Sequence, residues 1–196
     1  GDAVQVKHYV TGNDALISLA GPANKQGRII ADNICGGDSH YLGSQGSSVI
    51  KVFDMTAATT GINETNAKKS GLEVDTVILS PMSHAGYYPG GKVMTMKVVF
   101  EKETYRLLGA QIIGYEGVDK RIDVLATAIH AELKATQLKD LDLAYAPPYS
   151  SAKDPVNMVG FMIDNIAKGI LKQWHLEDMD KICLLYTSPS PRDGAT

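Results

Sequence analysis

The stretch Asp142-Leu-Ala-Tyr-Ala-Pro-Pro-Tyr-Ser-Ser-Ala-Lys-Asp-Pro-Val-Asn157 decides how the C-terminal half of the chain is organised. Its two consecutive prolines fix φ and remove two backbone donors, so the segment around them cannot lie inside a helix or a central strand. We therefore expect a rigid, extended turn here. Rigid loops often present functional side chains, in this case Tyr145, Tyr149 and Lys153. The alternative is a proline-rich connection whose tyrosines are packed for burial.

The composition indicates an ordinary globular protein and does not suggest a nucleic-acid or membrane binder. The chain of 196 residues is 44% hydrophobic and 21% charged, which allows one or two domains with a substantial core. Its formal net charge is −3 and it contains no basic cluster, so binding to nucleic acid or to an anionic membrane is not expected. No apolar run is long enough to span a bilayer.

Neither the cysteines nor the histidines form a recognisable metal or disulfide motif. Cys35 and Cys183 lie far apart and outside any CxxC pair, and the histidines show no ligand-like spacing. The sequence therefore predicts no metal site and no disulfide framework, with a cytoplasmic location as the default. Cys35 follows a predicted helix and is expected to be structural.

The first 46 residues are expected to contain one helix. Residues 3–18 are mixed in character and are predicted as loop, while residues 19–34 are predicted as a helix with a proline in its first turn. One face of this helix carries Ala23, Gly27, Ile30 and Ile34. Gly27 lowers helix propensity, which hints at close packing there. The turn-rich segment 35–46 lacks the spacing of a phosphate loop and is predicted as a linker between domains.

The chain from residue 46 to residue 171 is predicted to form one α+β domain. Strands are predicted at 47–53, 74–79, 93–100 and 105–113. The third of them alternates most regularly, with Met94, Met96, Val98 and Phe100 on one face. A short helix is predicted at 63–70. Together these elements predict an antiparallel sheet of about four strands with helices packed on it.

Two longer helices are expected to bury apolar faces. The segment 118–133 places Val118, Ile122, Leu125 and Ile129 on one face. The charged residues of its first turns, expected to form a solvated or interface face, are Asp119, Lys120, Arg121 and Asp123. After the proline loop, Asp154 is a good N-cap and Pro155 a good first residue of a last helix. Its apolar stripe is predicted to run to about Leu171 through Val156, Val159, Ile163, Ile166 and Ile170.

The proline-rich stretch also resembles part of a known family. Tyr145-Ala-Pro-Pro-Tyr-Ser-Ser-Ala-Lys-Asp-Pro-Val-Asn157 is similar to the C-terminal signature of FAD-dependent pyridine nucleotide-disulfide oxidoreductases, in the branch of CoA-disulfide reductases and NADH oxidases. Leu107-Leu-Gly-Ala-Gln-Ile-Ile-Gly114 resembles a second signature of that family. The resemblance runs from Gly1 to about Gly169. It implies the C-terminal piece of an FAD-binding α/β domain plus linker at 1–45, and the family's dimerisation domain at 46–171.

Both ends of the chain are expected to be cut from something longer. The sequence begins Gly-Asp-Ala without methionine. Residues 172–182 are predicted as a linker toward a missing domain, and Gln173–Met179 resembles the linker into a rhodanese-like domain found in some family members. Residues 183–196 are expected to derive from adapter DNA, with a natural disordered tail as the alternative.

The resemblance implies a flavin contact in the first segment. Asp2 would accept hydrogen bonds from the ribityl chain of FAD, because an acceptor-only carboxylate suits a sugar-like partner. The backbone N–H groups of Ala20 and Gly21, at the start of the first helix, would face the pyrimidine carbonyl of the flavin. An ordinary surface helix is the alternative.

The resemblance also implies that loops of one subunit complete the partner's active site. Tyr87 and Tyr145 would reach that site as catalytic residues, and Tyr145 would also touch the cofactor. Three further residues would bind substrate, namely Asn24, Arg28 and Lys153, the last near a phosphate of CoA. The alternatives are that both tyrosines are packing residues and that Lys153 is a solvated lysine beside an N-cap.

The activity implied by the resemblance is the reduction of CoA disulfide or a related disulfide or persulfide. NAD(P)H would reduce FAD, which would reduce a single cysteine that lies outside this chain, and the protein would be a homodimer. Two alternatives stay open. One is an NADH oxidase or peroxidase whose cysteine cycles through sulfenic acid. The other is a stand-alone dimerisation module without activity.

Overall fold

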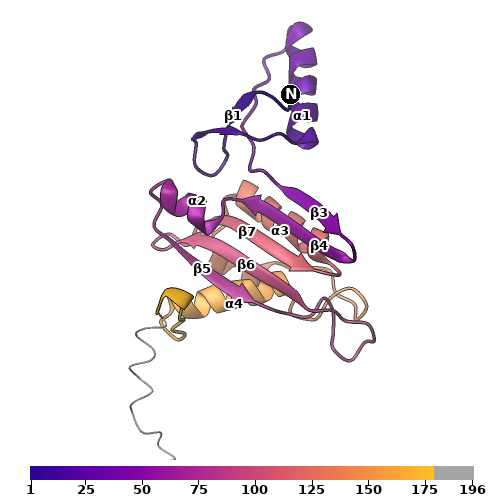
Figure 1. Ribbon diagram of the computed structural model, residues 1–196, viewed down its shortest axis with the longest axis vertical. Coiled ribbons are helices and arrows are strands. Elements are labelled where there is room, and N and C mark those ends of the chain that lie inside the picture. Colours follow the sequence, from indigo (N-terminus) through magenta and orange to yellow (C-terminus); the bar gives the residue numbers. More distant parts are fainter. Residues whose placement is uncertain (179–196) are drawn as a thin grey trace, which may run out of the picture. The chain divides into compact units, whose positions relative to one another are not determined.

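The computed structural model describes residues 1–178, which are drawn in colour in Figure 1. Residues 1–164 form one compact unit, and a second begins at Asn165. The sequence predictions for residues 179–196, among them those for Cys183 and the adapter-like tail, lie outside the described residues. Within the described part, no helix is long and apolar enough to cross a membrane.

Five antiparallel strands make the main sheet of the protein. Their order is β3-β4-β7-β6-β5, and every strand runs antiparallel to its neighbours (Figure 1). The strands are β3 (Ser48–Val52), β4 (Met55–Gly61), β5 (Val74–Leu79), β6 (Met94–Glu101) and β7 (Leu107–Gly114). Together with the helices described below, this sheet confirms the predicted α+β architecture.

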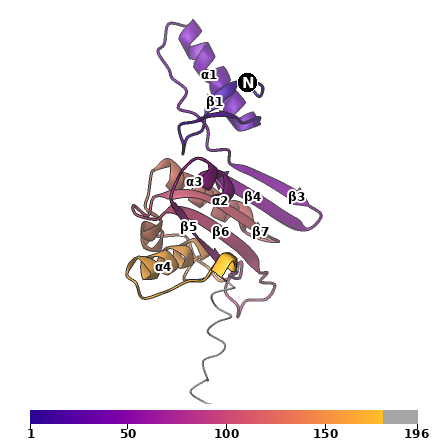
Figure 2. The same ribbon diagram turned by 60° about the vertical axis from the view of Figure 1, so that its left-hand side comes forward.

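The expectation of about four strands was wrong because it missed β4. The sequence of this strand, Met55-Thr-Ala-Ala-Thr-Thr-Gly61, has no large apolar side chain after Met55, so it carries little strand signal. β4 is a strand because it is paired on both sides, with β3 through a hairpin and with β7. Figure 2 shows the β3–β4 hairpin at one edge of the sheet.

The helix α3 (Val118–His130) covers one face of the sheet and crosses behind β4 and β7 in Figure 1. Its predicted apolar face is confirmed, since Val118, Ile122, Leu125 and Ile129 are all buried. The alternating residues of β6 are buried as well, namely Met94, Met96, Val98 and Phe100. Burial of each such side chain stabilises the fold by about 1.5–3 kcal/mol.

The helix α4 (Pro155–Ala167) begins where the sequence predicts and ends earlier. Its core residues Val156, Val159 and Ile163 are completely buried. The helix does not continue to Leu171, because Gly169 has φ +69°, a left-handed conformation typical of a helix end. Before α4 the chain forms the 3₁₀ helix η1 (Ala135–Asp140), and after it η2 (Leu176–Asp178).

The short helix α2 (Glu64–Lys69) matches its prediction. The Asn66 N–H donates to the side chain of Asn63, which caps the helix, and Gly71 follows with φ +78°. Glu64 in its first turn lies 2.6 Å from Lys68 and 2.5 Å from Lys97 of β6. This carboxylate therefore ties α2 to the sheet.

The N-terminal segment differs from its prediction in two ways. Residues 3–18 are not all loop, because β1 (Gln5–Lys7) and β2 (Asp14–Leu16) pair as a short antiparallel ribbon. The helix α1 (Ala20–Ile34) is present with Pro22 in its first turn, but none of its residues is buried. A Cβ at Gly27 would have no heavy atom within 4 Å, so the close packing inferred there is absent from the described residues.

Candidate functional site

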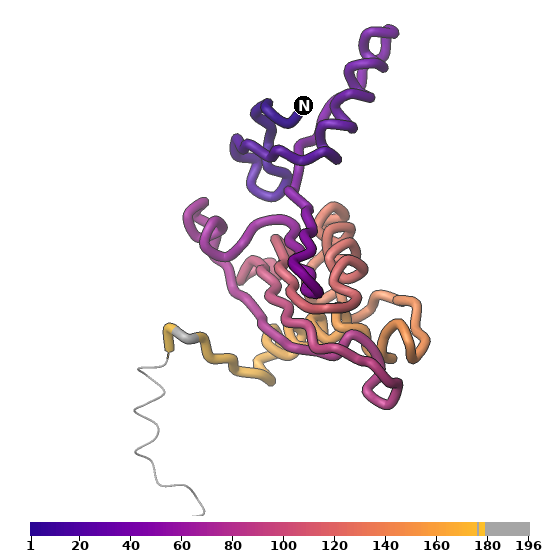
Figure 3. Tube along the Cα trace, turned by 45° about the vertical axis from the view of Figure 1, so that its right-hand side comes forward, coloured from indigo at the N-terminus to yellow at the C-terminus, as the bar shows by residue number. Residues whose placement is uncertain are grey.

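Two loops place the predicted catalytic tyrosines side by side. Tyr87 lies in the loop between β5 and β6, and Tyr145 lies in the proline loop between η1 and α4. Their hydroxyl oxygens are 2.7 Å apart and form a hydrogen bond. The side chains are 75% and 46% exposed, so neither tyrosine is packed for burial among residues 1–178. Figure 3 shows the two loops at the same end of the sheet.

Local sequence explains the shape of both loops. Around the two prolines, the N–H groups of Tyr149 and Ser150 donate to the Ala146 carbonyl and close a tight turn, which confirms that the segment forms a turn. In the other loop, the Ser83 N–H donates to the Lys92 carbonyl at 2.7 Å. The Ala85 N–H donates to the Ser150 carbonyl at 2.9 Å and joins the loops directly.

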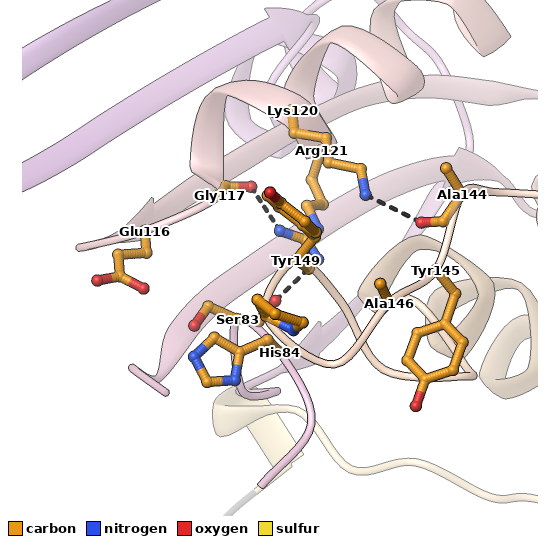
Figure 4. Close-up of a pocket in the computed structure, with 11 residues that line it drawn as sticks. Ser83, His84, Glu116, Gly117, Lys120, Arg121, Ala144, Tyr145, Ala146 and Tyr149 are labelled. Atoms are coloured by element: carbon orange, nitrogen blue, oxygen red, sulfur yellow. Dashed lines mark hydrogen bonds between the residues drawn. The ribbon is translucent and has the colours of Figure 1, made fainter. Parts of the chain in front are cut away.

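Beside the tyrosine pair lies an open pocket of about 520 Å³ (Figure 4). Its wall combines aromatic rings with polar groups, including His84, Glu116, Lys120, Tyr145 and Tyr149. The Lys120 ammonium donates to the Ala144 carbonyl at 3.4 Å. Tyr145 lines this pocket, and Tyr87 is bonded to its hydroxyl, so the phenol pair lies beside the pocket.

Arg121 lines the same pocket, and the prediction that it belongs to a solvated or interface face was wrong. The side chain is 1% exposed and is surrounded by carbonyl and carboxylate oxygens. Its Nη2 donates to the Ser83 carbonyl at 2.9 Å and its Nη1 donates to the Gly117 carbonyl at 3.2 Å (Figure 4). Its Nη2 also donates to Asp154 Oδ2 at 3.0 Å. Because Arg121 lies within a run of charged residues, which are normally exposed to solvent, its burial could not be predicted from the sequence pattern.

Asp154 is the counter-ion of this buried arginine and the N-cap of α4 at once. It is 3% exposed, and its Oδ1 accepts from the Val156 N–H at 3.0 Å. Burial favours the neutral acid, but hydrogen bonds from Ser150 and Val156 and the charge of Arg121 more than offset this. The pKa of the carboxyl is therefore lowered below its usual value, and Asp154 is ionised at neutral pH.

The tyrosine pair has its own electrostatic consequence. The hydrogen bond with Tyr87 raises the pKa of the Tyr145 phenol above its ordinary value near 10. Tyr145 is consequently a neutral phenol throughout the physiological range. It can donate a hydrogen bond or lend a proton to a basic atom placed in the adjoining pocket.

The predicted substrate residues lie on two separate elements. Asn24 and Arg28 are exposed and one turn apart on α1, where Arg28 Nε lies 3.1 Å from Asp32. Lys153 is also exposed and precedes α4, with its Nζ 5.6 Å from the ring centroid of Phe161. The structure thus brings Asn24 and Arg28 together and leaves Lys153 on another segment.

The residues predicted to contact the flavin offer hydrogen-bond donors for its carbonyl and an acceptor for its ribityl chain. α1 begins at Ala20, and the Leu19 side chain makes no capping hydrogen bond in the part of the chain that the structure describes. The first N–H groups of a helix have no partner within it, so Ala20 and Gly21 offer backbone donors to a carbonyl oxygen. Asp2 is exposed, so its carboxylate is accessible as an acceptor, while its main-chain carbonyl accepts from Ser18 Oγ.

The domain that holds the two loops belongs to a known class. Residues 47–155, more than half of the chain, match the family described as "Pyridine nucleotide-disulphide oxidoreductase, dimerisation domain". The chain therefore belongs to the pyridine nucleotide-disulphide oxidoreductases, a family of enzymes, and the resemblance seen in the sequence is confirmed.

Individual relatives are named for reactions of sulfur compounds. The NAD(P)H sulfur oxidoreductase (CoA-dependent) of Pyrococcus abyssi is 38% identical over 80% of this chain and 35% of its own length. The coenzyme A disulfide reductase of Staphylococcus epidermidis is 36% identical over 82% of this chain and 36% of its own length.

A solved structure agrees with these matches. The crystal structure of reduced Bacillus anthracis CoADR-RHD superposes with a TM-score of 0.90 and 49% identity, over 94% of this chain and 33% of that one. The chain thus spans about a third of the length of the relatives it matches.

Proposed function

We propose that this chain is the C-terminal part of a homodimeric flavoprotein that reduces CoA disulfide, or a related disulfide or persulfide, with NAD(P)H. The observation that carries the proposal is the hydrogen-bonded pair of exposed phenols, Tyr87 and Tyr145, beside an open pocket. The names of the most similar relatives supply the substrate class. FAD supplies the two-electron chemistry when it is bound.

The residues of this chain would act on the sulfur that leaves. Reduction of a disulfide RSSR by NAD(P)H and one proton gives two thiols RSH and NAD(P)⁺. As the S–S bond breaks, negative charge develops on the departing sulfur, and a neutral phenol can donate a hydrogen bond to it or protonate it. We assign this role to Tyr145, with Tyr87 orienting its hydroxyl, in the active site of the partner subunit.

The remaining predicted residues would bind the cofactor and the substrate. The N–H groups of Ala20 and Gly21 would hold the flavin carbonyl, and the Asp2 carboxylate would accept from the ribityl chain. Asn24, Arg28 and Lys153 would contact CoA, whose phosphates suit guanidinium and ammonium groups. What supports these assignments is that each of the residues is exposed and offers a donor or an acceptor.

The test is a product assay on a full-length protein that carries this chain. We expect a flavin absorbance band and two thiols released for each NAD(P)H oxidised in the presence of CoA disulfide, with no oxygen consumed. Oxygen consumption with no thiol release would instead identify an NADH oxidase. A protein with neither flavin absorbance nor turnover would be a dimerisation module, and either of these results would overturn the proposal.

A further inference from the structure

We propose that Arg121, clamped by Asp154 and Ser150, is the positioning residue that holds the hydroxyls of Tyr87 and Tyr145 in contact. The geometry of the pair stands on the structure alone, whereas its catalytic consequence rests on the proposed function. Arg121 touches neither tyrosine hydroxyl, so its effect must act through the backbone of the two loops.

The guanidinium of Arg121 bonds to one carbonyl in each tyrosine loop. Its Nη2 donates to the Ser83 carbonyl at 2.9 Å, four residues before Tyr87. The same nitrogen lies 3.3 Å from the Tyr149 carbonyl, four residues after Tyr145. Because one nitrogen makes both contacts, the two loop carbonyls are held close to the same point.

Besides Arg121, a backbone hydrogen bond from Ala85 to Ser150 joins the two loops, but the tyrosine rings themselves have little packing to hold them. With exposures of 75% and 46%, the rings of Tyr87 and Tyr145 are not held by a packed core. A hydroxyl pair at 2.7 Å ceases to be a hydrogen bond once the oxygens separate beyond about 3.5 Å. A shift of either loop by about 1 Å is therefore enough to break the pair.

The arginine is itself held on every side. Asp154 accepts from Nη2 at 3.0 Å and also accepts from Ser150 Oγ at 2.6 Å. Gly117, with φ +68°, leaves room for the guanidinium, because a Cβ there would lie 2.0 Å from Nη1 of Arg121. A buried charge that is paired and hydrogen-bonded in this way costs much to displace, so its position is well defined.

The experiment reads the tyrosine pair directly in the 196-residue chain. Tyrosines labelled with ¹³C at Cζ are followed by NMR as the pH is raised, and the Tyr145 signal is assigned with Tyr145→Phe. Tyr87→Phe gives the titration midpoint of Tyr145 without its partner. We expect Arg121→Lys to move the midpoint down to that reference, because a single ammonium cannot replace the three nitrogens with which Arg121 bonds to Asp154, to Gly117 and to the two loops.

Two further variants keep the test decisive. Ser150→Ala removes the hydroxyl that bonds to Asp154 and leaves Arg121 and Asp154 paired. It should move the Tyr145 midpoint in the same direction. This variant therefore tests the proposal even if Arg121→Lys does not fold. Ile122→Val shortens a buried side chain on the next position of α3 and should leave the midpoint unchanged.

A folded Arg121→Lys or Ser150→Ala variant with the wild-type midpoint would overturn the proposal. So would an equal shift in Ile122→Val, since the effect would then reflect general loosening of the domain. Because the readout is a titration and not turnover, this inference and the proposed reductase activity can fail independently.

Discussion

At the residue scale, single carboxylates join elements that are distant in sequence. Glu64 connects α2 to β6 through Lys97, and Asp154 connects α4 to α3 through Arg121. The two differ in solvation, because the Glu64 side chain is 25% exposed and that of Asp154 is 3% exposed. A partly exposed pair stabilises modestly, whereas breaking a buried pair is strongly destabilising.

Glu64 gives a prediction about acid stability. Hydrogen bonds from Lys68 and then Lys97 lower its pKa from 4.5 to about 2. A group whose pKa is lowered by folding contributes stability above its unfolded pKa and loses it as pH falls through the folded value. Denaturant unfolding should therefore show a contribution from Glu64 that is complete above pH 4.5 and disappears toward pH 2.

The matched variant for this prediction is Glu64→Gln, which keeps the shape of the side chain and removes the charge. It should destabilise the protein by about 1 kcal/mol at pH 7 and be indistinguishable from wild type near pH 2. A difference between the two proteins that stays constant from pH 7 to pH 2 would show that the ion pair contributes nothing.

At the scale of elements, α4 lies against η1 without a side chain between them. A Cβ built at Gly160 would lie 2.2 Å from the Lys139 nitrogen, so the backbones are nearly in contact. Asn157, one turn earlier, donates its Nδ2 to the Leu138 and Leu141 carbonyls at 3.0 Å each. The base of the proline loop is therefore anchored by backbone proximity as well as by hydrophobic burial.

We predict that Gly160→Ala destabilises the protein by about 2 kcal/mol or more, although alanine favours a helix by about 1 kcal/mol over glycine. Chemical denaturation followed by circular dichroism measures this. The matched control is Gly27→Ala in α1, where a Cβ would meet nothing within 4 Å. If Gly160→Ala were as stable as the control variant, the close approach of α4 and η1 would be refuted.

Several elements could be predicted from the sequence, because their signals are local. The alternation in β6 and the apolar face of α3 each lie within one continuous segment, and the prolines of the loop restrict φ directly. β4 could not be predicted, because its alanines and threonines become a strand only through pairing with β3 and β7.

In the candidate site, too, some residues could be predicted from the sequence and others could not. Tyr87 and Tyr145 were predicted as site residues because their segments resemble those of a known family. Arg121 was missed because its partner Asp154 is 33 residues away and its charged neighbours suggest a solvated helix face. The one local indication was Gly117, four residues before Arg121, because a residue without a side chain leaves room there for the guanidinium. No periodicity rule predicts such a contact.

At the scale of the whole molecule, the proposed role of the tyrosine loops requires a two-fold dimer. Residues 47–155 belong to a dimerisation domain, and two-fold dimers bury the same patch on both subunits. We therefore predict that the isolated 45–170 segment dimerises. Sedimentation at tens of micromolar, about the concentration at which a weak interface forms, should show a dimer. A monomer under these conditions would contradict the prediction.

The most direct test of the central claim is a double-mutant cycle on Tyr87 and Tyr145 in a full-length protein that carries this chain. Tyr145→Phe should lower turnover of CoA disulfide by about 1–3 kcal/mol of transition-state stabilisation while flavin content is kept. Tyr88→Phe is the matched control and should leave turnover unchanged. Because the two hydroxyls act as one unit, Tyr87→Phe combined with Tyr145→Phe should cost little more than Tyr145→Phe alone. Unchanged turnover in Tyr145→Phe, or fully additive losses in the double variant, would contradict the account.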